Sequence, residues 1–195
     1  MSIDATGDKE LIDQLQAGNL DALGELYDRY RHQIYRTALA ITHDPAAAED
    51  ILQECFLRVH HYAHRIDSSL PIAPWLYRVT VNLSYTWAKQ KPIKNLSIEV
   101  FIEQLISPSG HAPDTTVERV ELSERIHQAI ADLPFGQKVV IVLYYLNGMS
   151  LKEISDILDC PVGTVKSRLY HARESLKERI EESGSWLSDV AHGYT

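Results

Sequence analysis

The sequence predicts an all-α protein made of two small helical domains joined by a flexible linker, and three observations support this. Apolar residues recur at spacings of three to five along most of the 195 residues, which places them on one face of a helix. No stretch alternates clearly between apolar and polar residues, as a half-buried strand would. The apolar run 139–145 follows Pro134 with helical spacing, so we interpret it as a buried helix.

The third observation is a break in the middle of the chain. Residues 91–116 contain three prolines, one glycine and few periodic stretches. We therefore expect a linker at 93–116, between one helical domain at 8–92 and a second at 117–182. The tail 183–195 contains glycines and small polar residues, and we expect it to be frayed.

The first domain is expected to contain three principal helices. An apolar stripe runs along 23–39 and indicates the first of them. Asp44 is suited to cap the next helix, with Pro45 at its first helical position. Pro74 then begins a third helix, whose inner side carries apolar residues.

Composition excludes several classes of protein. Hydrophobic residues make up 45% of the chain, which is enough for a packed core. No apolar run reaches the roughly 18 residues of a membrane span, and the polar residues 1–10 do not resemble a secretory signal. Cys55 and Cys160 lie far apart without a CxxC partner, so we expect neither a disulfide nor a zinc knuckle. A cytoplasmic protein with no membrane insertion of its own is predicted.

Charge is distributed unevenly along the chain, whose net charge is −8. Residues 162–173 contain Lys166, Arg168 and Arg173 and no acidic residue. A local basic strip on an acidic chain suits DNA contact with low non-specific affinity. It also suggests that a large partner contributes much of the binding strength.

The basic strip lies in a predicted helix-turn-helix. Gly148 can end one helix in the left-handed conformation, and Ser150 with Glu153 forms a capping box for the next. The turn around Pro161 separates this short helix from a longer one that begins near Val162. The outer face of the longer helix carries hydroxyls and an imidazole, flanked by cations, which suits a helix lying in a major groove. The alternative is an ordinary helical hairpin with a solvated face.

These residues resemble region 4 of the extracytoplasmic-function (ECF) sigma factors. The resemblance rests on GMS at 148–150, EI at 153–154, CPVGTVKSR at 160–168 and AR at 172–173. The N-terminal half independently resembles region 2 of the same family, through DPAAAEDILQECF at 44–56 and PWLYRV at 74–79. Two matches in the right order cover most of the chain.

The resemblance implies a bacterial transcription initiation factor. Such a factor binds core RNA polymerase, at the β′ clamp helices and the β flap, directs it to promoters and helps to open the DNA. The domain at 8–92 would bind polymerase and the −10 element, and the domain at 117–182 the −35 element. Family members are usually held inactive by an anti-sigma factor, so we expect such a partner. The −35 contacts would come from Thr164, Lys166, Ser167, Arg168, Tyr170, His171 and Arg173.

The N-terminal domain carries two further faces that suit these roles. Polar residues on the outer face of the second helix, beside its apolar stripe, suit a basic partner surface, although a solvated acidic face is the alternative. The polymerase-binding candidates are Asp50, Gln53, Glu54 and Phe56. The third helix places cations, an amide and an aromatic ring on one face, as melted single-stranded DNA requires. The −10 candidates are Arg78, Asn82, Tyr85, Thr86, Trp87, Lys89 and Lys91, and Lys94 continues the basic character.

Some positions depart from the family pattern. The family commonly has an acidic residue at the position of Thr86 and an arginine at that of Lys89. Arginine is also frequent where this chain has His171, which cannot make the bidentate contact of arginine to guanine. We therefore expect a promoter preference shifted from the common family pattern.

Other readings of the sequence remain open. A conventional helix-turn-helix regulator, or a protein that only sequesters partners, would share some of these features. His60, His61 and His64 form a cluster, but no third ligand is evident for the zinc-compatible spacing of His60 and His64. No nucleophile–base arrangement or phosphate-cradling loop is evident, so we expect no catalytic activity and no cofactor.

Overall fold

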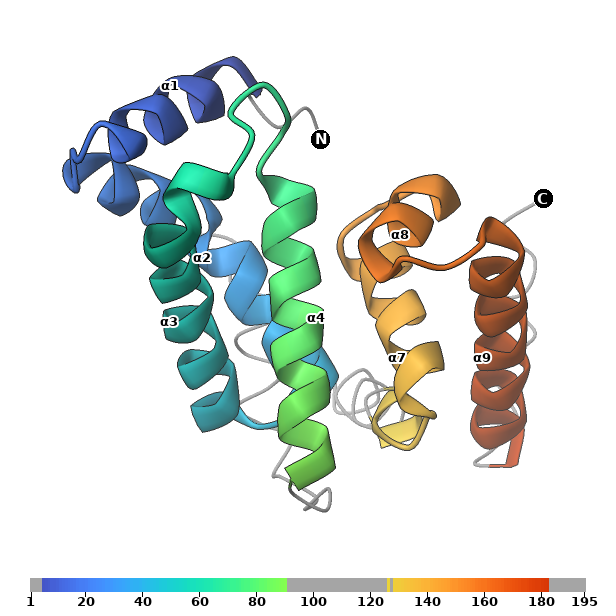
Figure 1. Cartoon of the computed structure of the whole chain (residues 1–195). Helices are drawn as coiled ribbons and strands as arrows, with labels where there is room; N and C mark the ends of the chain where they lie inside the picture. Colours follow the sequence, from blue (N-terminus) through green and yellow to red (C-terminus); the bar gives the residue numbers. More distant parts are fainter. Residues whose placement is uncertain (1–4, 91–125, 127, 183–195) are drawn as a thin grey trace, which may run out of the picture.

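The computed structural model describes residues 5–90, 126 and 128–182, and these contain helices and no strand (Figure 1). The prediction of an all-α protein is therefore confirmed for this part of the chain. The elements are α1 (Ala5–Gln16), α2 (Asp21–Thr42), α3 (Pro45–Tyr62), the 3₁₀ turn η1 (Ala63–Arg65), α4 (Ala73–Gln90), α7 (Phe135–Ile141), the π-helical turn η2 (Val142–Leu146), α8 (Leu151–Leu158) and α9 (Val162–Glu182). Outside the described residues lie Lys91, Lys94, the predicted linker at 93–116 and the tail at 183–195.

The N-terminal helices, α1 to α4, enclose one core (Figure 1). Helices α2, α3 and α4 pack against one another, and α1 packs on α2 and η1. The side chains of Tyr30, Leu39, Cys55 and Leu76 meet inside and are at most 1% exposed. Burying a large apolar side chain of this kind contributes roughly 1.5–3 kcal/mol relative to leaving it in water.

The predicted signals at the start of α3 are confirmed. The Asp44 carboxylate accepts a hydrogen bond from the backbone N–H of Ala47 at 3.0 Å, and Pro45 is the first residue of the helix. The carboxylate thus satisfies one of the N–H groups that a helix start leaves without an internal partner.

Helix α1 has no counterpart among the predicted helices. Its Asp8 is fully buried and accepts hydrogen bonds from Arg29 and from the hydroxyl of Tyr30, both on α2. Burial, followed by the bond to Asp8, raises the pKa of Tyr30. This buried, paired carboxylate fixes α1 against α2.

The C-terminal helices, α7, η2, α8 and α9, contain the predicted helix-turn-helix. Gly148 has φ +66°, the left-handed conformation expected of it, and Ser150 with Glu153 forms the complete capping box at the start of α8. Asp159, with φ 49°, ends α8, and α9 begins at Val162 as predicted. In the apolar run 139–145, residues 139–143 are buried and helical as expected, but the helix widens from Val142 into the π-helical turn η2 and Tyr145 is exposed.

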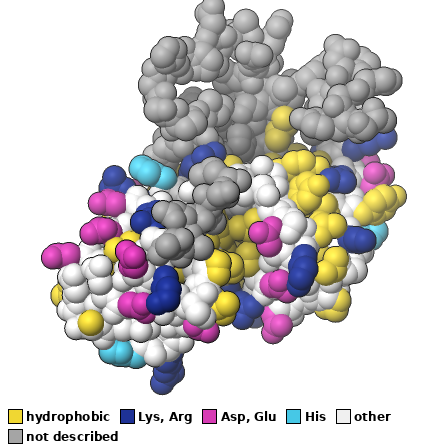
Figure 2. Space-filling model, turned by 90° about the horizontal axis from the view of Figure 1, so that it is seen from above, with side chains coloured by type: hydrophobic (Ala, Val, Ile, Leu, Met, Phe, Trp, Pro, Cys, Tyr) yellow, Lys and Arg dark blue, Asp and Glu magenta, His cyan; other side chains and the backbone are white. Residues whose placement is uncertain are grey.

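The two groups of helices lie directly against each other. Helix α4 packs on α8, while α2 packs on η2 and α7, so α4 lies between its own bundle and the helix-turn-helix (Figure 1). Seen from above, apolar side chains gather toward the middle and right of the molecule, and charged side chains of both signs are scattered on both sides (Figure 2). We call the boundary between the two groups the seam. None of the described helices is long and apolar enough to cross a membrane.

Candidate polymerase and nucleic-acid interfaces

Helix α9 is anchored by a buried stripe and presents the opposite face to solvent. Val165, Leu169 and Ala172 are at most 5% exposed and pack toward α7 and α8. The outer positions fall where the sequence predicted them. Lys166, Ser167, Tyr170, His171 and Arg173 are exposed, whereas Thr164 and Arg168 are half-buried.

The cations of this face differ in how firmly they are held. Arg173 donates from Nε to the hydroxyl of Tyr145 at 2.8 Å, and its guanidinium lies over the rings of Tyr144 and Tyr145. Arg168 extends across the start of α7, where a Cβ built on Gly136 would lie 3.3 Å from its Nε. Lys166 is exposed and makes no hydrogen bond or ion pair with the described residues. Lys166 is therefore free to follow a phosphate, while the two arginines are oriented by the C-terminal helices.

The tyrosine rings that orient Arg173 were not predicted from the sequence. Tyr144 and Tyr145 lie in the run that we had interpreted only as a buried helix, yet Tyr145 is 59% exposed. Two adjacent tyrosines at the end of a run of aliphatic residues were the signal available in the sequence. Tyr170 is 61% exposed, and its ring stands edge-on to that of His171 at 5.5 Å.

The acidic ridge on α3, formed by Asp50, Gln53 and Glu54, faces outward as predicted. Asp50 and Gln53 are exposed, and half-buried Glu54 accepts from Arg58 Nε at 2.8 Å. Phe56 does not lie on this surface: it is 5% exposed, and its ring packs edge-on against Tyr27 in the core. Its position supports the helix beneath the ridge and gives it no direct contact with a partner.

One apolar side chain completes the ridge and was not predicted. Leu57 is 63% exposed and lies seven residues after Asp50, on the same face of α3. The signal was present in the sequence, because Leu57 falls outside the apolar stripe of its helix. Removing this exposed apolar surface from water on binding a partner would be favourable.

The predicted −10 residues on α4 also share a face, the α4 stripe of Arg78, Asn82, Tyr85 and Lys89. All four are exposed, and Lys89 Nζ lies 4.4 Å from the centre of the Tyr85 ring. Thr86 is exposed and donates its hydroxyl to the backbone oxygen of Asn82 at 3.0 Å.

Trp87 is half-buried and, at about 100° per residue, falls on the opposite side of α4 from this stripe, so it does not share the face of the other −10 candidates. Lys91, the last of the predicted −10 residues, lies outside the described residues.

The α4 stripe is engaged at the seam. Arg78 donates from Nε to the carbonyl of Ile157 at 3.2 Å and from its terminal nitrogen to the carbonyl of Asp156, both on α8. The ring of Tyr85 lies 5.1 Å from that of Phe135 on α7.

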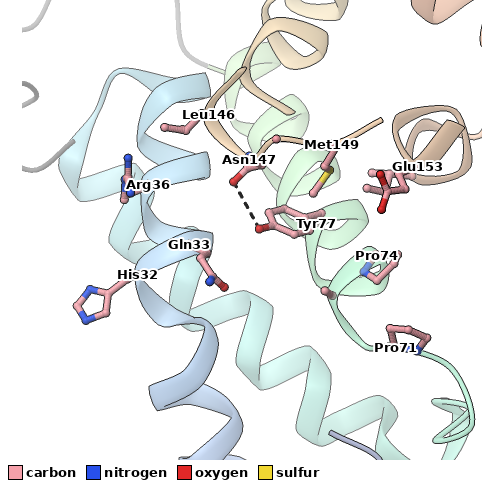
Figure 3. A pocket seen from close by; sticks show the side chains of 13 residues that line it. His32, Gln33, Arg36, Pro71, Pro74, Tyr77, Leu146, Asn147, Met149 and Glu153 are labelled. Atoms are coloured by element: carbon pink, nitrogen blue, oxygen red, sulfur yellow. Dashed lines mark hydrogen bonds between the residues drawn. The ribbon is translucent and has the colours of Figure 1, made fainter. Parts of the chain in front are cut away.

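Farther along the seam, Asn147 Oδ1 accepts from the Thr37 hydroxyl at 3.2 Å. It also accepts from the Tyr77 hydroxyl at 3.4 Å (Figure 3). A cavity of 660 Å³ adjoins these contacts and is lined from both groups of helices, with Tyr77, Asn147 and Met149 among its walls (Figure 3).

The histidines and cysteines show no arrangement for chemistry in the described part of the chain. His60, His61 and His64 are exposed, and no group of three histidine, cysteine or acidic residues there could hold a metal ion. Burial raises the pKa of Cys55 to about 12, which leaves its thiol unreactive at neutral pH. Cys160 is half-buried in the turn of the helix-turn-helix.

Comparison with known families and proteins agrees with this geometry. Residues 26–91 match the family described as Sigma-70 region 2, and residues 123–176 match Sigma-70, region 4. The chain is 35% identical to the ECF RNA polymerase sigma factor SigW of Bacillus subtilis over 182 residues, covering 89% of this chain and 97% of that protein. It is 30% identical to the ECF RNA polymerase sigma-E factor of Escherichia coli K12, covering 89% of this chain and 94% of that protein.

Solved structures share the fold. The structure of CnrH in complex with the cytosolic domain of CnrY superposes with a TM-score of 0.68 at 22% identity, covering 91% of this chain and 99% of that one. The sigma factor RpoE of Bartonella quintana, in complex with the anti-sigma factor NepR, gives a TM-score of 0.62 at 20% identity, covering 84% of this chain and 98% of that one.

Proposed function

Because the chain belongs to the extracytoplasmic-function sigma factors, which direct RNA polymerase to specific promoters, we propose that its two groups of helices divide promoter recognition between them. The observation that carries this proposal is the presence of two separate exposed faces, on α4 and α9, suited to different forms of DNA. The units proposed are 8–92 for polymerase and −10 binding, 93–116 as linker and 117–182 for −35 binding.

The α9 face suits the major groove of the −35 element. Ser167, Tyr170 and His171 are exposed at its centre, where side chains would meet base edges. Lys166 and Arg168 flank them and would hold phosphates on either side. Arg173, already oriented by two tyrosine rings, would keep its remaining guanidinium donors for the DNA backbone. Half-buried Thr164 lies at the helix start, where N–H groups attract phosphate.

The α4 stripe suits the melted −10 strand. Tyr85 is 44% exposed, and the ammonium group of Lys89 lies over its ring. A base can therefore stack on the aromatic ring while the cation binds a phosphate. Asn82 offers donors and an acceptor to base edges, and Arg78 adds a second cation. Thr86, bonded to its own helix, supplies no charge where family members commonly have one, so we propose that it alters −10 preference.

The acidic ridge suits core polymerase. Asp50, Gln53 and Glu54 stand on a rigid helix, and exposed Leu57 supplies an apolar centre that the ridge surrounds. We assign this surface to the β′ clamp helices, and contact with the β flap to the C-terminal helices.

Family membership supports proposals for the regulation and the location of the protein. Two proteins of similar fold have been solved in complexes, and one of them, the sigma factor RpoE, is bound to a partner named as an anti-sigma factor. We propose that this chain too has an anti-sigma partner and that it acts in the cytoplasm. We also propose that it has no catalytic activity of its own, as is usual for a sigma factor.

Transcription in vitro tests this assignment. Core RNA polymerase from the source bacterium, given a pool of its genomic promoter fragments, should start discrete transcripts only when the protein is added. Asp50→Lys should reduce these transcripts and core binding together, because it reverses charge in the ridge. Glu49→Lys makes the same change on an adjacent, exposed position of α3 outside the ridge, and should have little effect. No core binding at micromolar protein would refute the proposed function.

A further inference from the structure

Arg78 is bound by the C-terminal end of α8. Its guanidinium donates to the carbonyls of Asp156 and Ile157, in the last turn of the helix. The last carbonyls of a helix have no partner within it and carry the negative end of the helix dipole. The carboxylates of Asp156 and Asp159 line the same small hollow as Arg78. To Arg78, this helix end therefore offers what a DNA phosphate offers, which is oxygen acceptors with negative charge.

Two further contacts extend the same engagement along the seam. Near the other end of the α4 stripe, the ring of Phe135 packs at 5.1 Å from that of Tyr85, covering part of the surface proposed for base stacking. Between α2 and α4, Asn147 joins the Thr37 and Tyr77 hydroxyls. The C-terminal helices thus occupy two of the four residues of the α4 stripe.

The seam is also incompletely packed, so it can open. The 660 Å³ cavity lies between its polar contacts, and Gln33 Oε1 and Arg36 Nε, which belong to its lining residues, are buried without a hydrogen-bond partner. A buried polar atom without a partner and a cavity in an interface both weaken the closed arrangement. Closure depends on the contacts named above, together with the packing of α4 on α8 and of α2 on η2 and α7.

We propose that the protein on its own is held in this closed arrangement, and that the end of α8 competes with the −10 strand for Arg78. This inference rests on the −10 role assigned to α4 under the proposed function. Binding of the −10 strand requires the seam to open, so the apparent dissociation constant is the intrinsic one divided by the open fraction. A domain that is open about one-tenth of the time would bind the strand about tenfold more weakly than a permanently open one.

Variants on the C-terminal side test the competition without touching the α4 stripe. Phe135→Ala removes the ring contact to Tyr85, and Asn147→Ala removes the acceptor for Thr37 and Tyr77. The probe is a fluorescein-labelled single strand carrying the non-template −10 sequence of a promoter mapped by transcription with this protein. Each variant of the full chain should bind it about 3- to 10-fold more tightly than the wild type, and the double variant more tightly still. Leu20→Ala, which removes a large apolar side chain that is 60% exposed and lies outside the seam, should leave affinity unchanged.

Amide hydrogen exchange supplies a second readout that does not depend on affinity. Saturating wild-type protein with the strand should increase amide exchange over 154–160. The strand binds Arg78 on α4 and so releases the end of α8, which the strand itself does not cover. The free Phe135→Ala and Asn147→Ala proteins should show that increase without DNA.

The possible failures are distinguishable. Equal affinity in all variants, or unchanged exchange over 154–160 when the strand is bound, would overturn the competition. Raised exchange in the free variants with no strand binding by any protein would overturn the −10 role of Arg78, and so the competition, while leaving the closed arrangement standing. Unchanged exchange in the free variants would overturn closure itself.

Discussion

Replacing Lys166 with alanine isolates one cation of the α9 face. The side chain is exposed and is not engaged by the other described residues, so its loss removes a charge without disturbing packing. One phosphate contact contributes about 0.9 to the slope of log affinity against log salt on duplex DNA. Between 50 and 200 mM salt, a slope smaller by about 0.9 means that the variant loses about 3.5-fold less affinity than the wild type. The prediction concerns duplex DNA carrying the −35 element, bound by the reconstituted holoenzyme.

Fluorescence anisotropy titrations at four salt concentrations would measure this slope. Lys9→Ala removes a cation from α1, far from α9 in the fold, and should leave both affinity and slope unchanged (Figure 1). Substitution of Arg168 is a poorer probe, because it also removes packing over Gly136. A Lys166→Ala slope equal to the wild-type slope would show that this ammonium contacts no phosphate, and would refute its assigned place beside the groove.

Three further predictions concern stability and polymerase binding. Burial lowers the pKa of Lys138 from 10.5 to about 8. At pH values between these two, Lys138 binds a proton in the unfolded chain more often than in the folded protein. The free energy of unfolding should therefore rise with pH, by roughly 1.4 kcal/mol per pH unit. Urea titrations from pH 8 to 9.5 would show this rise, and a Lys138→Met protein with the same rise would exclude Lys138 as its source. Gly148→Ala should lower the free energy of unfolding by about 1–2 kcal/mol because φ is +66°. Gly24→Ala, in open space on α2, should raise it by about 0.5–1 kcal/mol. Equal effects of the two substitutions in urea titrations would contradict the backbone argument. Leu57→Ala should change stability by less than about 0.5 kcal/mol yet weaken core polymerase binding about 5- to 30-fold; unchanged binding by biolayer interferometry would remove Leu57 from the interface.

Local signals predicted the helix-turn-helix well because each acts over one turn of chain. The capping box at Ser150, the left-handed Gly148 and the start of α9 at Val162 depend only on neighbouring residues. The same holds for the cap at Asp44. Helix α1 escaped prediction because its anchor is Asp8, a buried carboxylate whose partners lie more than twenty residues away. A polar residue in a short stretch of sequence carries no sign that it will be paired at long range.

The candidate sites were predicted as faces, and faces are what helical periodicity can supply. Periodicity placed the outer residues of α9 and the ridge of α3 correctly. It did not reveal that two tyrosines hold Arg173, or that Phe56 turns inward. Those facts depend on which other helix lies opposite, and that information is absent from the spacing of residues along one helix.

The α4 stripe shows this limit most clearly. Cations, an amide and an aromatic ring at helical spacing indicate a surface that binds something with oxygen acceptors and flat rings. Melted DNA fits that description, and so do the carbonyls at the end of α8 together with the ring of Phe135. Because both occupants use the same chemistry, the sequence could predict the binding surface and could not distinguish its intramolecular occupant from its DNA ligand. The same likeness is the physical reason that one can displace the other.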